Sequence, residues 1–325
     1  MDNNSNVIMA LCSHLCVTDG VSPLEPREWA ELAKRLLNNN LQPEDIINFS
    51  ESDFLNKLQI GKDFSQRIIR LLDRSASLSF ELSRYANMGI YAITRADREY
   101  PERLKKKLGN ACPPIFYYSG NLSLLDNRSI GFVGSRSAGE ADEAFTKRIV
   151  STVVGNGFSA VSGGAKGIDS IACEFAISCG GTATEFLSDS MLRKLRNSTD
   201  VEAIQNSKLL LLSVTKPDAG FNAGIAMMRN KYIYSQSDAT IIIKSDKGKG
   251  GTWNGAIENL KKGWCTEYCR NIKHPGNVEL IRMGAIPIDE NWDGTITKTE
   301  FDKSKVKSIQ SEVKKPDGVQ LSLFD

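Results

Sequence analysis

The sequence predicts an α/β protein with a doubly wound, mostly parallel sheet, preceded by a small helical domain. From residue 130 onward, short apolar runs alternate with helical stretches. Several of these runs lack polar alternation, as expected for parallel strands that are buried on both faces. Helices between them would form right-handed crossovers, which place a ligand site at the carboxyl ends of the strands. The runs are Ile130–Val133, Phe158–Val161, Thr182–Leu187, Leu209–Val214 and Ile241–Ile243.

The first 85 residues differ, because their apolar residues recur at helical spacing, for example at Trp29, Leu32 and Leu36. The segment LQIGK at 58–62 faintly resembles a helix-hairpin-helix or SAM-like turn, whose backbone N–H groups hold a DNA phosphate. A plain connection between two helices is favoured over that function. The predicted domains are a helical module over 1–85, an α/β domain over 86–288 and a flexible, polar tail over 289–325.

Composition and charge fit a globular protein and give no sign of a membrane. The 325 residues carry a formal net charge of +2 and are 41% hydrophobic, so any basic surface has to be local. No apolar run is long enough for a bilayer, and the N-terminus lacks the basic start of a signal peptide. Seven cysteines, an odd number, suit a reducing compartment. We expect a cytoplasmic protein.

Two cysteine pairs raise the question of a metal site. Cys12 with Cys16 and Cys265 with Cys269 each span a gap of three residues, yet the chain contains two histidines in all. Zinc sites usually join such a pair to a second pair or to paired histidines. Buried or incidental thiols are therefore favoured, and we expect neither a metal nor a cofactor.

A glycine-rich turn from Gly134 to Gly139 follows the first of the apolar runs. Gly134 and Ser135 let the backbone approach an anion, and Arg136 is suited to a bidentate contact with a phosphate. The turn does not match Gly-x-Gly-x-x-Gly, so NAD is not indicated. Glycine-rich turns also serve packing, so this turn alone does not decide the function.

A second turn of the same kind, SGGAKGID at 162–169, follows the next run and carries Lys166. Turns that follow neighbouring parallel strands converge at one edge of the sheet, where they form a phosphate pocket. Together the two turns favour a functional site over mere packing.

Two later segments add cations and polar groups. Arg229 and Lys231 are candidates for phosphate contacts and Asn230 for a hydrogen bond to sugar or base. Phe221 is a candidate for stacking on a base, with a place in the core as the alternative. The loop GKGGTWNG at 248–255 lies before another helix. The candidate DNA- or phosphate-binding residues are Gly134, Ser135, Arg136, Ser162, Gly163, Gly164, Lys166, Gly167, Arg229, Asn230, Lys231, Lys249, Gly251 and Thr252.

The motifs VGSR at 133–136, SGGAKGID at 162–169 and MRNK at 228–231 resemble, in order and spacing, the DNA-processing protein A (DprA/Smf) family. YPERL at 100–104 and PPIFYYSG at 113–120 resemble that family's lead-in to the first strand. The resemblance covers roughly residues 86 to 285. It implies an extended Rossmann-like domain that binds single-stranded DNA, helps to load a RecA-type recombinase and commonly forms a homodimer.

In the family, arginines and lysines of these turns hold DNA phosphates, a role that the resemblance carries to Arg136, Lys166, Arg229 and Lys231. The chain also departs from the family pattern. Cys173 stands where family members usually have histidine, and the tail does not resemble the winged-helix domain that some members carry. These departures indicate a divergent branch.

Two other functions remain open. The same superfamily includes nucleoside-monophosphate phosphoribohydrolases, but Gly255 stands where their carboxylate belongs, so the general acid or base is missing. Glu258, one helical turn further on, is the alternative acid. A sensor of a small nucleotide in a defence pathway would use the same phosphate pocket. We expect a protein that is not an enzyme.

The end of the chain, Gln320-Leu321-Ser322-Leu323-Phe324, resembles the short peptide by which bacterial replication and repair proteins dock on the β sliding clamp. Its leucines and phenylalanine are apolar anchors on a polar tail. Docking is favoured over a C-terminus that folds back on its own core.

Overall fold

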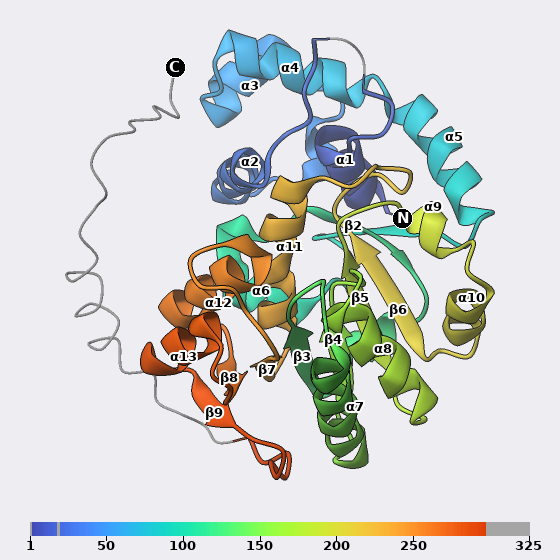
Figure 1. The fold of residues 1–325 in the computed structure, drawn as a ribbon. Helices are drawn as coiled ribbons and strands as arrows, with labels where there is room; N and C mark the ends of the chain where they lie inside the picture. The colour runs from blue at the N-terminus through green and yellow to red at the C-terminus, as the bar shows by residue number, and fades with distance from the viewer. Residues whose placement is uncertain (1, 18–19, 297–325) are drawn as a thin grey trace.

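The computed structural model describes residues 2–17 and 20–296, and its centre is a nine-stranded sheet (Figure 1). The strands are β1 (Tyr91–Thr94), β2 (Ile115–Ser119), β3 (Ser129–Val133), β4 (Ser159–Ser162), β5 (Ala183–Leu187), β6 (Leu209–Ser213), β7 (Ala239–Ile242), β8 (Thr266–Arg270) and β9 (Ile286–Ile288). Their order is β1-β2-β6-β5-β4-β3-β7-β8-β9. Pairing is parallel from β6 to β9 and antiparallel between β1, β2 and β6. The predicted fold class is confirmed.

The five apolar runs became the five central strands, β3 to β7, in which every residue is buried. Buried strands of this kind need helices on both faces of the sheet. The helices that follow β1 are α6 (Glu102–Leu108), η2 (Gly109–Ala111), η3 (Leu122–Asp126), α7 (Glu140–Gly155), α8 (Ile168–Ser178), α9 (Met191–Lys194), α10 (Ser198–Gln205), α11 (Ala223–Gln236), α12 (Gly250–Lys262) and α13 (Pro275–Arg282).

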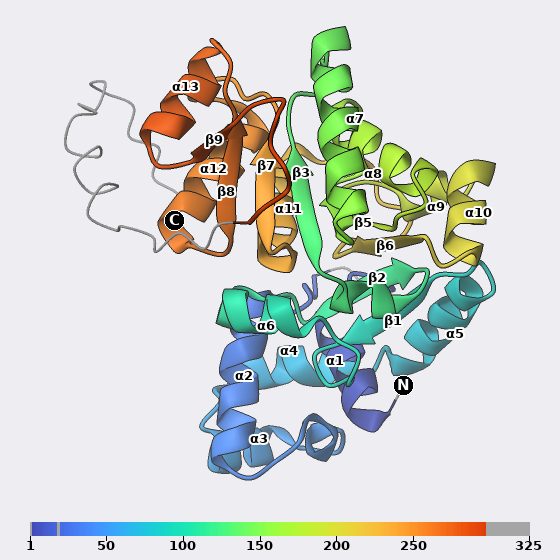
Figure 2. The same ribbon diagram turned by 90° about the horizontal axis from the view of Figure 1, so that it is seen from below.

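The side chains of successive strand residues point to opposite faces of the sheet and pack in two cores, one on each face. Ile130 and Phe132 of β3 pack in a core with α7 and α8, whereas Val133 packs in a second core with α6, α11 and α12. Figure 2 shows α7 and α8 lying together on one side of β3, away from α12 and α13.

The strand order reverses at β3. The chain steps outward from β3 to β4, β5 and β6, then crosses back through α11, so that β7 pairs with the other edge of β3. The loops after β3 and β7 therefore leave the sheet in opposite directions. Open parallel sheets bind ligands in the crevice at such a switch point.

The described residues up to Ala86 form helices joined by loops, as the apolar spacing predicted. The helices are α1 (Asn3–Cys12), α2 (Pro26–Asn38), η1 (Pro43–Ile46), α3 (Glu51–Leu58), α4 (Lys62–Leu72) and α5 (Ser75–Ala86). Trp29, Leu32 and Leu36 of α2 are buried in one continuous core with residues of the sheet. The segment 58–62 connects α3 to α4. A separate domain that ends at residue 85 stays a prediction.

Arg74, between α4 and α5, connects these helices to the end of α1. It is 7% exposed, and its guanidinium donates hydrogen bonds to the carbonyls of Ala10 and Ser13 at the end of α1 and of Leu15 just beyond it. The carbonyls at the helix end carry the negative end of the helix dipole, which compensates the buried charge. The Ser13 hydroxyl lies 2.7 Å from that of Tyr117 in β2, so α1 is also tied to the sheet.

Beyond β9 the described chain continues along the body of the protein to residue 296. The ring centroid of Trp292 lies 5.4 Å from that of Tyr268, and Asn156, which caps the end of α7, donates a hydrogen bond to the carbonyl of Asp293. The predicted clamp-docking peptide, 320–324, lies outside the described residues. Across the described part of the chain, no helix combines the length and apolar character needed to cross a bilayer.

Candidate nucleic-acid interface

The two glycine-rich turns predicted from the sequence pack directly on one another. The N–H of Ile168 donates to the carbonyl of Ser135 over 3.3 Å. A Cβ on Gly134 would lie 2.6 Å from the Ile168 side chain. Gly167 has φ +91° and its Cβ would meet the Ser135 carbonyl oxygen at 2.5 Å, so any other residue is excluded there. The convergence of the two turns is thus fixed by close backbone contact.

Arg229 of α11 forms the floor of the cavity between these elements. A Cβ on Gly163 would lie 1.2 Å from Nη1 of Arg229, so the guanidinium fills the space that a side chain would take at this glycine. From there Nη1 reaches Oδ2 of Asp169 over 3.4 Å, and the arginine side chain is 3% exposed. Burial lowers the pKa of Arg229 and raises that of Asp169, while the attraction between the two charges opposes both shifts.

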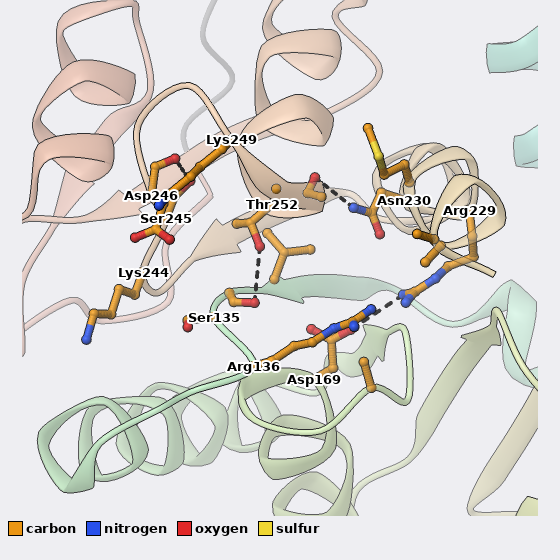
Figure 3. Close-up of a pocket in the computed structure, with 18 of the residues that line it drawn as sticks. Ser135, Arg136, Asp169, Arg229, Asn230, Lys244, Ser245, Asp246, Lys249 and Thr252 are labelled. Carbon is orange, nitrogen blue, oxygen red and sulfur yellow. Dashed lines mark hydrogen bonds and ion pairs between the residues drawn. The ribbon is translucent and has the colours of Figure 1, made fainter. Parts of the chain in front are cut away.

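The cavity has a volume of about 400 Å³ and opens at the switch point between β3 and β7. Its walls come from the turn after β3, the start of α11 and the loop that leads into α12. Figure 3 shows Arg136 and Arg229 pointing toward one another, with Lys249 and Thr252 across the cavity. Among the described residues, neither Arg136 nor Lys249 is paired with a carboxylate, and both are exposed. The exposed charges of Arg136 and Lys249 make this cavity attractive to an anion.

Phe221 lies at the mouth of the cavity and is 51% exposed. Its ring centroid is 4.8 Å from the guanidinium carbon of Arg136. This contact orients the arginine by a cation–π interaction and leaves an aromatic face beside the proposed phosphate position. Of the two alternatives for Phe221, the exposed position is the one observed.

The N-terminus of α12 adds backbone donors. Gly250, Gly251 and Thr252 line the cavity, and the first N–H groups of a helix have no partner within the helix. The Thr252 hydroxyl donates to the carbonyl of Gly134 over 3.1 Å. The Asn230 amide donates to the carbonyl of Gly251 over 2.8 Å. Asn230 thus uses its N–H₂ group to hold the helix start in place.

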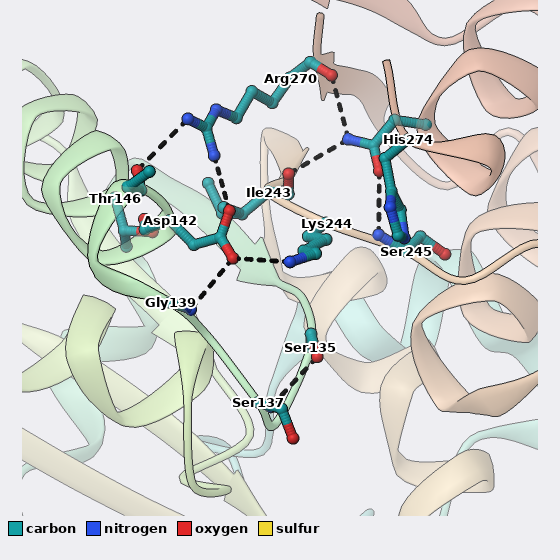
Figure 4. Close-up of polar contacts among 12 residues, drawn as sticks. Ser135, Ser137, Gly139, Asp142, Thr146, Ile243, Lys244, Ser245, Arg270 and His274 are labelled. Carbon is teal, nitrogen blue, oxygen red and sulfur yellow. Dashed lines mark hydrogen bonds and ion pairs between the residues drawn. The ribbon is translucent and has the colours of Figure 1, made fainter. Parts of the chain in front are cut away.

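A buried ion cluster aligns the turn after β3 with the strands beyond it (Figure 4). Asp142, at the start of α7, accepts hydrogen bonds from Lys244 over 3.0 Å and from Arg270 over 2.8 Å. Burial raises the pKa of Asp142, but these cations and the Gly139 N–H outweigh it and lower the pKa below its usual value. Lys244 also lines the cavity. No pattern in the sequence links Asp142 to Arg270, because the residues are 128 positions apart.

Eight of the fourteen predicted residues line the cavity, namely Gly134, Ser135, Arg136, Arg229, Asn230, Lys249, Gly251 and Thr252. The others lie around it. Ser162 is buried and donates its hydroxyl to the carbonyl of Phe132 over 2.6 Å, and its phosphate contact stays a prediction. Gly164, with φ +62°, packs against Glu185. Lys166 is exposed on its turn.

Lys231 lies outside the cavity, because it points away from Arg229 on a different face of α11. Its ammonium nitrogen is 5.2 Å from the ring centroid of Tyr232. Burial lowers its pKa, and the nearby charge of Glu258 opposes that shift. Lys231 therefore does not add its charge to the described lining of the cavity.

Each carboxylate that lines the described cavity has a side-chain partner. Asp169 is paired with Arg229, and Oδ1 of Asp246 lies 3.3 Å from Nε2 of His274. Glu258 is exposed on α12 and is absent from the described lining. Cys173 is buried in α8, where burial raises its pKa. Within the described ranges, no three His, Cys, Asp or Glu side chains are grouped as metal ligands.

The fold and the cavity define a Rossmann-like α/β protein with an anion-attracting pocket at the topological switch point. Residues 91–297 match the family model of the DNA recombination-mediator protein A, and the chain belongs to this family.

Individual relatives agree with this assignment. The chain is 25% identical over 240 residues to the DNA processing protein DprA of Bacillus subtilis, covering 70% of this chain and 79% of the relative. It is 28% identical over 224 residues to protein Smf of Synechocystis, covering 60% of this chain and 54% of Smf. The crystal structure of Streptococcus pneumoniae DprA has a TM-score of 0.69 at 16% identity, over 95% of this chain and 98% of the other. A Helicobacter pylori DprA structure, described for its single-stranded DNA binding mode, has a TM-score of 0.50 at 22% identity, over 69% and 96%.

Proposed function

We propose that this protein binds single-stranded DNA, with a phosphate held in the cavity at the switch point, and acts in DNA processing, recombination or repair. The observation that carries the proposal is the convergence of Arg136 and Lys249, both without a carboxylate partner among the described residues, on the first turn of α12. Cations and free N–H groups at one point are the usual means of holding a phosphate. The single-stranded DNA binding described for the Helicobacter pylori relative supports this ligand.

The binding should be largely independent of base sequence. The cavity offers charge and backbone donors, which contact phosphates, and an exposed aromatic ring at Phe221, which stacks on any base. We propose that Arg136 and Lys249 hold the phosphate directly. Arg229 serves as the charged floor, and Asn230 and Thr252 support the helix start.

A catalytic role is not part of the proposal. Cleavage of a nucleotide's glycosidic bond needs a placed carboxylate, and the carboxylates that line the described cavity are bound to Arg229 and His274. A sensor of a small nucleotide uses the same anion site and is the second candidate. The open, positively charged mouth with its exposed ring favours a polymer over a mononucleotide.

The partners and setting remain proposals of the same kind. The family resemblance supports a RecA-type recombinase as the protein partner, and homodimer formation. The tail sequence Gln320–Phe324 supports docking on the bacterial β sliding clamp. The cysteine usage supports a reducing compartment, the cytoplasm.

The test is competition against a labelled single-stranded oligonucleotide by unlabelled single strands, duplex DNA, RNA and mononucleotides. Single strands should compete best. Affinity should fall with rising salt, with a log–log slope of about −0.7 per phosphate neutralised. A mononucleotide that competes as well as the oligonucleotide, or an affinity indifferent to salt, would favour the sensor instead.

A further inference from the structure

One face of α11 exposes two methionines beside the cavity. Met227 is 45% exposed and Met228 is 43% exposed, although large apolar side chains are usually buried. Gly224, Met227, Met228 and Lys231 follow the spacing i, i+3, i+4, i+7, which places them on one face of the helix. We call these four residues the α11 strip.

The α11 strip is continuous with the phosphate cavity. Met227 itself lines the cavity, as does the exposed ring of Phe221 just before the helix. At the other end of the strip lies the ammonium group of Lys231. Seven residues of helix span about 10 Å, which leaves room for unstacked bases between the cavity and Lys231.

The strip therefore presents an apolar surface between two positively charged places. A polynucleotide has the complementary pattern, because apolar base faces alternate along it with phosphates. A protein partner with an apolar patch would not need the cations at both ends. The pattern thus selects a nucleic acid as the occupant.

We propose that Met227 and Met228 receive the nucleobases of the strand whose phosphate lies in the cavity, and that Lys231 holds a later phosphate of the same strand. This inference rests on the proposed function and names the surface that distinguishes single strands from duplex. Thioether groups are polarizable and adaptable, so they contact the face of any base. In a duplex the base faces are covered by their neighbours and cannot reach the strip.

The experiment measures the affinity of two proteins for each of two ligands. The wild type and the variant Met227→Ala/Met228→Ala are titrated with an oligo-dT strand and with a strand of equal length that has abasic sites in place of the bases. The variant should lose about fivefold to tenfold in affinity for oligo-dT, the range expected for two thioether contacts with π faces. Its affinity for the abasic strand should stay within about twofold of that of the wild type.

Two controls make the result specific. Met88 is 46% exposed, and it is not among the residues that line the cavity, so Met88→Ala should leave both affinities unchanged. Arg136→Ala should weaken both strands alike, because phosphates are common to them. Alanine favours helix as much as methionine or more, so α11 should keep its circular dichroism signal.

The possible failures are distinct. If the wild type binds neither strand at low salt, the proposed function itself fails. If Arg136→Ala weakens both strands but the methionine variant binds oligo-dT like the wild type, only the base contact is refuted. Equal losses of the methionine variant on both strands would also refute it, as would an altered oligomeric state with unchanged DNA affinity.

Discussion

The floor and the rim of the cavity use the same residue type in opposite ways. At the floor, the Arg229 side chain is 3% exposed, lies against Gly163 and is paired with Asp169. At the rim, Arg136 is exposed and contacts the ring of Phe221. Both arginines lie in motifs that the sequence analysis predicted to bind phosphate. Only the rim arginine has its charge free for a ligand, since a buried cation is already committed to its partner.

This difference separates residues that build the cavity from residues that meet the ligand. Substitution of a floor residue should mainly lower the free energy of unfolding, because an unpaired charge remains in the interior. Substitution of a rim residue should lower the affinity for DNA and leave the stability unchanged, because water takes the place of the lost side chain. The two effects can be measured independently.

The largest effect is expected from Arg229→Ala. The change leaves Asp169 buried without its cation, which typically destabilises a protein by about 3–5 kcal/mol. Urea denaturation followed by circular dichroism measures the loss. Adding Asp169→Ala should recover part of it, because the buried charge is then removed as well. A variant as stable as the wild type would show that Arg229 does not hold the floor.

A second buried carboxyl, which has no cation beside it among the described residues, sharpens the comparison. Glu267 in β8 is 4% exposed, and burial raises its pKa from 4.5 to about 8, opposed by a hydrogen bond from Asn259. The folded protein therefore holds a proton that the unfolded chain releases, so stability should fall as the pH rises from 4.5 to 8, by a few kcal/mol.

Glu267→Gln removes this titration while keeping the shape of the side chain. Its free energy of unfolding should change less than that of the wild type between pH 4.5 and 8, and the variant should gain relative stability at the alkaline end. Parallel slopes for the two proteins would mean that Glu267 is charged in the fold. DNA affinity at pH 7 should be the same for both.

A smaller effect, of about 1 kcal/mol, is expected at the rim. Arg136→Ala should weaken single-stranded DNA binding by about fivefold and flatten the salt slope by roughly one contact, with unchanged stability. Fluorescence anisotropy over a range of salt measures both quantities. Arg196→Ala is the matched control, because Arg196 is also exposed but does not line the cavity. Equal affinities of the two variants would remove Arg136 from the site.

The smallest effect on DNA binding, none at all, is expected from Leu323→Ala/Phe324→Ala in the tail. The same change should abolish binding of a 320–325 peptide to the bacterial sliding clamp, for which about micromolar affinity is reasonable given the small apolar contact. Fluorescence anisotropy with the wild-type and the substituted peptide measures clamp binding. The same method with the full-length variant measures DNA binding. A wild-type peptide that does not bind the clamp would refute docking.

Much of the architecture was determined by the sequence. Five short, mainly apolar runs predicted the central strands β3 to β7, because strands buried on both faces need little polar alternation. The glycines after β3 and β4 predicted two turns that meet, and the turns do pack on each other. The edge strands β1, β2, β8 and β9 were not predicted, since their patterns carry less of this signal.

What each charged side chain does was decided by the tertiary structure. Arg229 is committed to Asp169, which lies 60 positions away, and Lys244 to Asp142, which lies 102 positions away. Lys231, two residues after Arg229, lies outside the cavity because successive helical positions point in different directions. A sequence pattern reports residue type and local spacing, so it marks where a strand ends and a cation follows. Whether that cation is free to bind depends on long-range partners that meet only when the sheet is assembled.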